Sequence, residues 1–185
     1  MSANDLAGPI RVRWRGADIE TVADLWPTGA RVAVVALHPF VCGVEAGHHF
    51  HKRLGQQALG WLADAADVAR PGEVALDDAL AQAGFALCSV VPRPGPRESA
   101  LERGDVAEGV AALRPRLVEG GVRLVVCPFE PAARALAGRA VAPGRHADAV
   151  APGVDLFRMP GPFQPRVERE ALLGELRVAV GAARG

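Results

Sequence analysis

A short run of consecutive apolar residues, Val32 to Ala36, constrains the fold of this chain more than any other feature. A strand with one exposed face alternates apolar and polar side chains, whereas a strand buried on both faces of a parallel sheet is apolar throughout. The run ends near His38-Pro39 and is followed by a loop, residues 37–53, with several glycines and histidines. Because ligands of open α/β sheets bind beyond the carboxyl ends of such strands, this strand and loop predict a site.

Two further runs have the same character, Phe85 to Val91 and Val122 to Cys127, and Val154 to Arg158 is a fourth strand that is shorter and less apolar. Between them, apolar residues recur every three or four positions, which is typical of amphipathic helices. The expected helices are 54–69, 76–83, 105–119 and 167–183, with a shorter helical turn at 131–136. The segment 138–153, rich in Ala, Pro and Gly, predicts a loop. Strands that alternate with helices predict a three-layer αβα sandwich around a central, mainly parallel four-stranded sheet.

Residues 1–27 form an N-terminal extension to this sheet. Within it, Ile10 to Trp14 alternates apolar and basic residues and predicts a half-exposed strand. Asp18 is a suitable N-cap for a short helix from Ile19 to Leu25. The length of 185 residues is expected to form a single domain, 1–185, with room for a sizeable core.

The charge balance limits the classes of partner. The chain carries 21 basic and 21 acidic residues and no net charge, so DNA binding has to depend on a local basic patch. Its three cysteines lack Cys-x-x-Cys spacing, which argues against zinc-ribbon and iron–sulfur sites. The sequence has no signal peptide and no apolar run of about 18 residues. We therefore expect a cytoplasmic protein without membrane contact, and we expect it to be a monomer.

The candidate site lies in the four loops that follow the strands, 37–53, 92–97, 128–131 and 159–166. His38 follows the first strand, and three roles are open to it there. An imidazole that titrates near neutrality can activate water as a general base, or it can attack a sugar carbon as a nucleophile. It can also be a hydrogen-bonded structural residue. We take His38 as the candidate catalytic residue.

A histidine cluster, His48, His49 and His51 with Glu45 nearby, suggests a metal site. Protein metal sites need ligands held on defined faces and supported by further carboxylates. A cluster within a loop is weak evidence for that arrangement, and one histidine can instead contact a ligand or the loop backbone. The prediction is therefore no metal and no cofactor.

Basic residues at the strand ends form a candidate phosphate-binding rim: Lys52, Arg53, Arg93, Arg97 and Arg166. Cationic side chains in this position would neutralise phosphates of a DNA backbone. Glutamates lie close to several of them in the sequence, so a solvated surface of mixed charge is the alternative. DNA is the predicted partner, through this local rim.

Two motifs, in consistent order, resemble the uracil-DNA glycosylase superfamily and, within it, the mismatch-specific uracil/thymine DNA glycosylases. Ala36-Leu37-His38-Pro39-Phe40 stands where the family has Gly-Ile-Asn-Pro-Gly after a buried strand, and Gly47-His48-His49-Phe50 follows at the family's spacing. Met159-Pro160-Gly161-Pro162-Phe163-Gln164 stands at the second motif, after the fourth apolar run. The resemblance covers roughly residues 28–182.

The resemblance implies base excision, in which a base is flipped out of duplex DNA and its N-glycosidic bond is hydrolysed. Phe50 would stack on the flipped base, the loop around His38 would hold the attacking water, and Met159 to Arg166 would clamp the DNA. The candidate substrate-binding residues are Pro39, Phe40, Gly47, His48, His49, Phe50, Arg93, Pro160, Gly161, Pro162, Phe163 and Arg166.

Three positions differ from the family's motifs. His38 stands where the family has Asn, Gly161 where it has Asn or His, and Phe40 where it has Gly. The first hypothesis is a DNA glycosylase-like hydrolase that excises uracil or a modified base, with His38 in place of the usual Asn. The alternatives are a degenerate member that binds DNA without base excision, and a repurposed member that takes a small nucleoside-like ligand.

Overall fold

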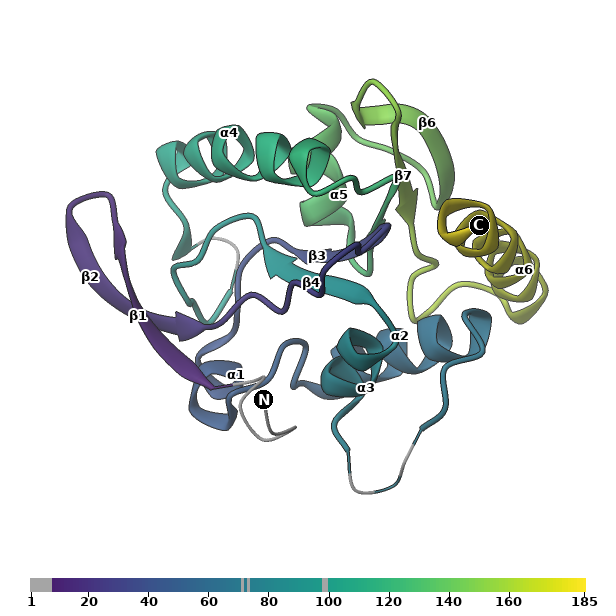
Figure 1. Ribbon diagram of the computed structural model, residues 1–185, viewed down its shortest axis with the longest axis horizontal. Coiled ribbons are helices and arrows are strands. Elements are labelled where there is room, and N and C mark those ends of the chain that lie inside the picture. Colours follow the sequence, from purple (N-terminus) through teal and green to yellow (C-terminus); the bar gives the residue numbers. More distant parts are fainter. Residues whose placement is uncertain (1–7, 71, 73, 98–99) are drawn as a thin grey trace.

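The central element of the computed structural model is a five-stranded sheet with the strand order β4-β3-β5-β7-β6 (Figure 1). Its strands are β3 (Val32–Ala36), β4 (Phe85–Ser89), β5 (Leu124–Cys127), β6 (Gly144–Ala151) and β7 (Val154–Arg158). Four of them run parallel, which confirms the mainly parallel sheet, and β6 is antiparallel to β7. The structure describes residues 8–70, 72, 74–97 and 100–185, so the first seven residues of the N-terminal extension lie outside it.

The sheet has one strand more than the sequence predicts. The additional strand, β6, comes from the segment 138–153, for which the composition predicts a loop. Only Gly144 and Val150 of β6 are buried, so the segment shows no regular apolar alternation. It becomes a strand because residues 152–153 turn the chain back into β7, and the pairing is irregular between His146 and Ala151. An edge strand of this kind depends on its neighbour more than on its own residues.

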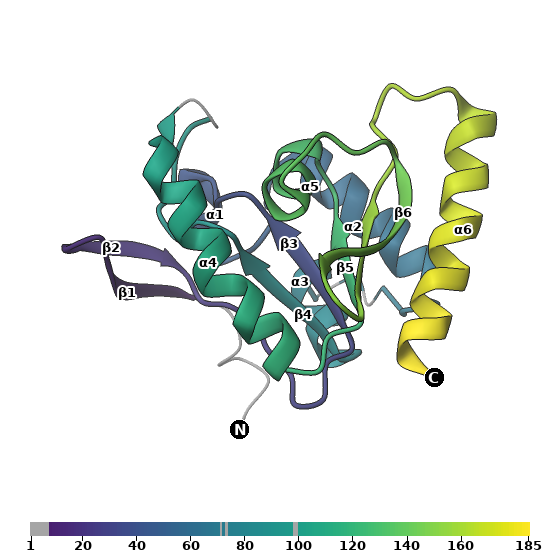
Figure 2. The same cartoon turned by 90° about the horizontal axis from the view of Figure 1, so that it is seen from above.

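Helices cover both faces of the sheet and complete three layers (Figure 2). One face carries α2 (Arg53–Ala65), α3 (Leu76–Gln82) and α6 (Arg166–Arg184), and the other carries α4 (Arg103–Glu119) and α5 (Glu130–Ala137). Alternate residues of β3 enter opposite cores, Val32 and Val34 the first, Ala33 and Val35 the second. Both faces of β3 are therefore buried, which explains why its residues are apolar throughout. Within the part of the chain that the structure describes, no helix is long and apolar enough to cross a membrane.

The N-terminal extension forms an antiparallel hairpin that projects from one side of the molecule (Figure 1). Its strands are β1 (Pro9–Trp14) and β2 (Ala17–Val22). The predicted helix from Ile19 to Leu25 is therefore wrong. Arg15 and Gly16 have positive φ angles of 48° and 82°, and a two-residue turn of this kind directs the residues after it into a paired strand.

After the hairpin the chain runs along the outer edge of β4. The Leu25 amide donates to the Leu87 carbonyl at 2.9 Å, and the Leu87 amide donates to the Leu25 carbonyl at 2.7 Å. Trp14 and Trp26, on either side of β2, pack against the core beneath α4 and α5. The extension is thus held to the sheet by backbone pairing and by aromatic burial.

The strand order contains a switch point between β3 and β5. From β3 the chain crosses to β4 on one side, and from β4 it returns past β3 to β5 on the other. The first crossover holds α1 (Val41–Ala46), α2 and α3, and the second holds α4. At such a point the loops that leave the two adjacent strands diverge, and a crevice opens between them.

Two helical glycines, Gly109 and Gly174, differ in how closely the neighbouring chain packs against them. A Cβ at Gly109 of α4 would overlap the carbonyl oxygen of Val90, whereas a Cβ at Gly174, exposed on α6, would meet nothing within 4 Å. We expect Gly109→Ala to lower the free energy of unfolding by about 2 kcal/mol, because the backbone has to shift. We expect Gly174→Ala to raise it by about 0.5–1 kcal/mol, because alanine is the better helix former. Urea unfolding measures both, and an equal effect of the two substitutions would contradict this packing.

Candidate functional site

A cavity of about 750 Å³ lies at the carboxyl edge of the sheet, at the switch point. Its walls come from the loops after β3, β5 and β7, together with Ser89 at the end of β4. They are mainly apolar and aromatic, with a small number of polar groups. A volume between about 300 and 1,000 Å³ and a lining of this kind are typical of small-molecule sites. The cavity therefore occupies the edge of the sheet at which the sequence predicts a site.

His38 lies in the cavity wall and is only 5% exposed. Its Nδ1 is 2.9 Å from the carbonyl oxygen of Pro39. A carbonyl oxygen only accepts, so Nδ1 is the nitrogen that carries the hydrogen, and the neutral ring has its lone pair on Nε2. The amide of Gly95, in the loop after β4, donates to the same carbonyl at 3.1 Å. His38 is thus held in one tautomer, with Nε2 able to take a proton.

Two aromatic pairs line the cavity. The ring of Phe40 lies edge-on to the His38 ring, 5.4 Å between centroids, and the Lys52 Nζ lies 3.8 Å from the Phe40 ring centre. Phe50 and Phe129 are 6.4 Å apart at an angle of 40° and come from the loops after β3 and β5. The sequence identifies Phe50 but not Phe129. Its position directly after a buried strand and Pro128 is the signal that could have identified it.

The backbone at Phe50 adopts an unusual conformation. Its φ is +55°, a region that non-glycine residues seldom occupy. Helix α2 holds the loop in this conformation, because the side-chain amide of Gln56 donates a hydrogen bond to the Phe50 carbonyl at 3.1 Å. A Cβ at Gly55 would lie 2.5 Å from that same carbonyl oxygen, so only glycine allows this approach. Backbone strain of this kind often accompanies a side chain placed for a function.

The histidines after α1 differ in their surroundings. His49 is buried, and its Nε2 donates to the Ala23 carbonyl at 2.9 Å. Its backbone amide donates to Oδ2 of Asp77 at 2.7 Å. His48 lies in the cavity wall and faces Asp77 and Asp78 in the first turn of α3. Burial, and next the negative charge of Asp77, raise the pKa of Asp78.

The structure brings most of the predicted residues together. The cavity is lined by His38, Pro39, Phe40, His48, His49, Phe50, Gly161 and Pro162. Gly47 lies outside the lining and ends α1 with a φ of 74°. Pro160 is buried behind the wall, whereas Phe163 is 94% exposed at the surface.

The two arginines predicted to bind substrate are held elsewhere. Arg93 pairs with Asp105 and Arg166 with Glu170, the latter at 2.6 Å. Lys52 and Arg53 remain at the cavity as exposed cations. The basic rim at the cavity is therefore smaller than the sequence suggests, because acidic residues of α4 and α6 neutralise part of it.

Two polar groups of the wall lack partners. The Ser89 hydroxyl and the Arg158 Nε are buried, and neither has a hydrogen-bond partner among the described residues. The remaining guanidinium of Arg158 donates to the Val141 carbonyl at 2.6 Å, which holds its position. Each is the last residue of its strand, β4 or β7. The available sequence signal was a polar residue at the end of an apolar run for Arg158, and a polar residue within the run Phe85 to Val91 for Ser89.

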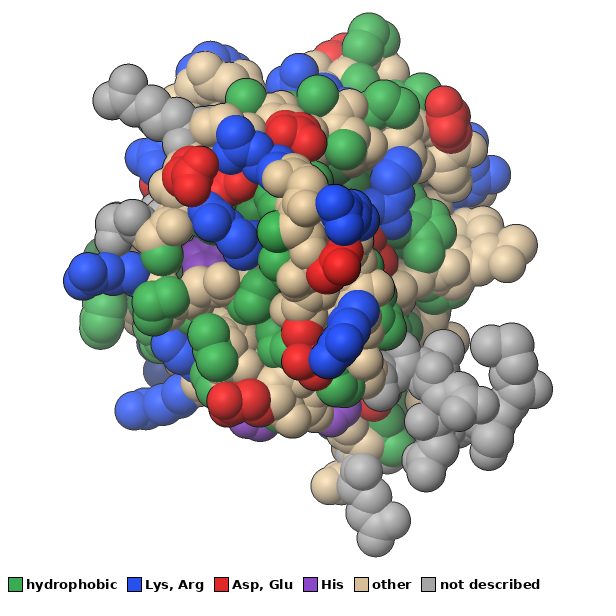
Figure 3. All heavy atoms as spheres, turned by 90° about the vertical axis from the view of Figure 1, so that its left-hand side faces the viewer, with side chains coloured by type: hydrophobic (Ala, Val, Ile, Leu, Met, Phe, Trp, Pro, Cys, Tyr) green, Lys and Arg blue, Asp and Glu red, His purple; other side chains and the backbone are tan. Residues whose placement is uncertain are grey.

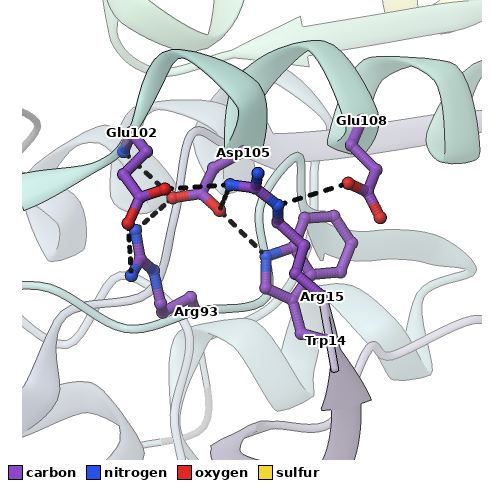
Figure 4. Close-up of polar contacts among 6 residues, drawn as sticks. All are labelled: Trp14, Arg15, Arg93, Glu102, Asp105 and Glu108. Carbon is purple, nitrogen blue, oxygen red and sulfur yellow. Dashed lines mark hydrogen bonds and ion pairs between the residues drawn. The ribbon is translucent and has the colours of Figure 1, made fainter. Parts of the chain in front are cut away.

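A buried carboxylate in the first turn of α4, Asp105, joins three parts of the chain (Figure 4). One oxygen accepts hydrogen bonds from the Trp14 indole and the Arg15 guanidinium, each at 3.2 Å. The other accepts the Glu102 amide at 3.0 Å and pairs with Arg93. The hairpin, the loop after β4 and α4 therefore converge on one side chain.

This carboxylate also supports His38 indirectly. Arg93 fixes the loop after β4, whose Gly95 amide donates to the Pro39 carbonyl that orients His38. Burial by itself raises the pKa of Asp105, but the hydrogen bonds and the arginine charges outweigh burial and lower the pKa below its ordinary value. The ionised form is therefore the one that the folded chain stabilises.

No protein-family model matches the chain, and a search of curated proteins finds no match. The groups of the cavity are an oriented imidazole, aromatic rings in edge-on and tilted pairs, and unpaired polar groups at the strand ends. Such a set can bind a flat, polar-edged ligand and can remove a proton from a water beside it.

Replacement of Asp105 tests the network. We expect Asp105→Asn to lower the free energy of unfolding by about 1–3 kcal/mol at pH 7. The substitution removes the buried carboxylate that Arg15 and Arg93 share and leaves them only the exposed glutamates, Glu102 and Glu108. The control, Asp18→Asn, removes one carboxylate of an exposed pair with Arg13, and we expect less than about 0.5 kcal/mol. Urea unfolding of both proteins provides the measurement.

The pH dependence of the same variants gives a second readout. The pKa of Asp105 is lower in the folded chain than the value of about 3.9 in unfolded chains. Its stabilising contribution is therefore present above about pH 4 and disappears as the pH falls through the lower, folded value. We expect the stability gap between the wild type and Asp105→Asn to narrow below pH 4. A gap that stays constant down to pH 2 would contradict this assignment.

Proposed function

We propose that the chain hydrolyses the N-glycosidic bond of a nucleobase, as in base excision from DNA, with His38 as the general base. The observation that carries this proposal is the state of His38 in the cavity. The Nδ1 of His38 is hydrogen-bonded to the Pro39 carbonyl, the side chain is almost fully buried, and aromatic rings line the same cavity. The resemblance to the mismatch-specific glycosylases implies that the loop around the same position holds the attacking water.

The cavity offers the groups that a flat base requires. Phe50, held in its strained conformation, and Phe129 provide the aromatic surface for stacking. Ser89 and Arg158 belong to the lining, and the Ser89 hydroxyl and the Arg158 Nε are buried without a partner among the described residues, so a small side-chain movement would let them meet polar edges of a base. A site that hydrogen-bonds its ligand in this way discriminates strongly against analogues that lack the matching groups.

The reaction follows from these positions. A water oxygen attacks the anomeric carbon as the bond from that carbon to the base nitrogen breaks, and the bonding electron pair leaves with the base. Nε2 of His38 takes the proton from the water, and the released base, as an anion, is stabilised by the Arg158 cation. Glu130 is the only carboxylate among the described lining residues, and it pairs with Arg134 at 3.3 Å. We therefore assign the base role to the oriented imidazole of His38 and not to a carboxylate.

A free nucleoside is the second candidate substrate, because part of the predicted phosphate-binding rim is neutralised. Arg93 and Arg166 are paired with carboxylates, which leaves Lys52 and Arg53 at the cavity. On the face that carries the hairpin, Lys and Arg side chains lie among Asp and Glu side chains without a broad basic patch (Figure 3). A few cations suit a small ligand as well as they suit a short contact with DNA.

A base-release assay tests the proposal. The substrates are duplexes with uracil, a thymine mismatch or hypoxanthine, and the corresponding free nucleosides. We expect release from at least one of them, and we expect His38→Gln to slow single-turnover release at least about 100-fold, the usual share of a general base. The control, His146→Gln, replaces a histidine of the edge strand β6 that does not line the cavity.

Thermal unfolding has to show that both variants remain folded. If the wild type releases no base from any substrate at high enzyme concentration, the proposal fails. It also fails if His38→Gln is as fast as the wild type. Release from duplexes only identifies DNA as the substrate, whereas release from nucleosides only identifies the second candidate.

A further inference from the structure

Three side chains beside the cavity form a compact set of possible metal ligands. They are His48, in the loop after α1, and Asp77 and Asp78, in the first turn of α3. Their ligand atoms all lie within 4.8 Å of one another. The Nδ1 of His48 is 3.3 Å from both oxygens of Asp77 and 4.0 Å from Oδ2 of Asp78.

The carboxylates of this set are not fully satisfied. Asp77 has no exposed side-chain surface, and its Oδ2 accepts the His49 amide at 2.7 Å. Its Oδ1 lies near the His48 Nδ1 but not in hydrogen-bonding geometry, and it has no donor among the described residues. The Oδ1 of Asp78 is buried without a donor as well. A buried, adjacent pair of carboxylates is costly unless positive charge compensates it.

We propose that His48, Asp77 and Asp78 bind a divalent transition-metal ion of the Zn²⁺ type. One imidazole and two carboxylates are a donor set suited to such ions, whereas Mg²⁺ prefers oxygen ligands only. Bonds of about 2.0 Å at tetrahedral angles separate ligand atoms by about 3.3 Å, the spacing found between His48 and Asp77. Asp78, whose side chain is 19% exposed, has room to close the longer spacing.

The surroundings hold the ligands in place. The His49 amide fixes Oδ2 of Asp77 and leaves Oδ1 for the ion. A Cβ at Gly43 would lie 2.9 Å from the His48 carbonyl, so the backbone that carries His48 packs closely against α1. His48 also lines the cavity, whereas Asp77 and Asp78 do not, so the ion would lie behind the cavity wall. The ion would join the loop that carries Phe50 to α3.

The site predicts metal binding that does not depend on base hydrolysis, so its test is separate from that of the proposed function. The full chain, freed of metal by a chelator, is titrated with Zn²⁺ by calorimetry and with Co²⁺ by visible absorption. We expect one equivalent of Zn²⁺ to bind and to raise the melting temperature, Co²⁺ to give a visible ligand-field band, and Mg²⁺ to bind far more weakly.

Variants identify the ligands. We expect His48→Ala and Asp78→Asn each to weaken Zn²⁺ binding at least tenfold and to remove the Co²⁺ band. The matched control is His51→Ala, an exposed histidine of the same loop that is not in the cluster, and we expect it to bind as the wild type does. Asp77→Asn is less decisive because Asp77 also anchors the His49 amide.

Two results would overturn the proposal. One is a wild-type chain that binds no Zn²⁺ in the calorimeter, which would show that a protonated His48 alone compensates the carboxylates. The other is Zn²⁺ binding that survives His48→Ala and Asp78→Asn unchanged, which would place the ion elsewhere.

Discussion

The architecture around the site depends on the Asp105 carboxylate. The hairpin, the loop after β4 and the helix α4 share this one acceptor. Without it the Trp14 indole would lose its hydrogen-bond acceptor, and Arg15 and Arg93 would keep only exposed glutamates as charge partners. Asp105 influences the cavity through the loop after β4, which Arg93 holds in place. The Gly95 amide of that loop donates to the Pro39 carbonyl, and the same carbonyl accepts the hydrogen bond of the His38 ring. The strand β3 places His38 at the edge of the sheet, and the contacts between the neighbouring loops orient its ring.

The parallel strands were predictable because each is buried on both faces. A residue such as Val34 faces one helix layer and its neighbour Val35 faces the other, so neither position tolerates a polar side chain. The hairpin and β6 carry no such signal. Their residues are exposed on at least one side, and their pairing is decided by the turn at Gly16 and by the neighbouring strand β7.

The site was predictable in part for the same reason. His38 and Phe50 could be identified because they follow the most apolar strand and fall in recognisable motifs. Phe129 also follows a buried strand but falls in no motif, and Asp77 could not be identified because its importance comes from a contact with a residue far away in the chain. Arg93 shows what the sequence does not reveal about charge: its place at a strand end suggests a ligand contact, and in the fold a carboxylate of the next helix pairs with it. A basic residue in a sequence can be assigned to ligand binding only once the acidic residues that pair with it in the fold are known.

The borders of the sheet have a consequence for how copies of this chain can meet. On one side the Leu25 backbone occupies donor and acceptor groups of β4, and on the other the pairing of β6 is interrupted between His146 and Ala151. A regular, open border would offer a template on which a strand of another molecule could add itself, the first step of ordered aggregation. Here both borders are poor templates, so the apolar strands between them are shielded from intermolecular β-pairing.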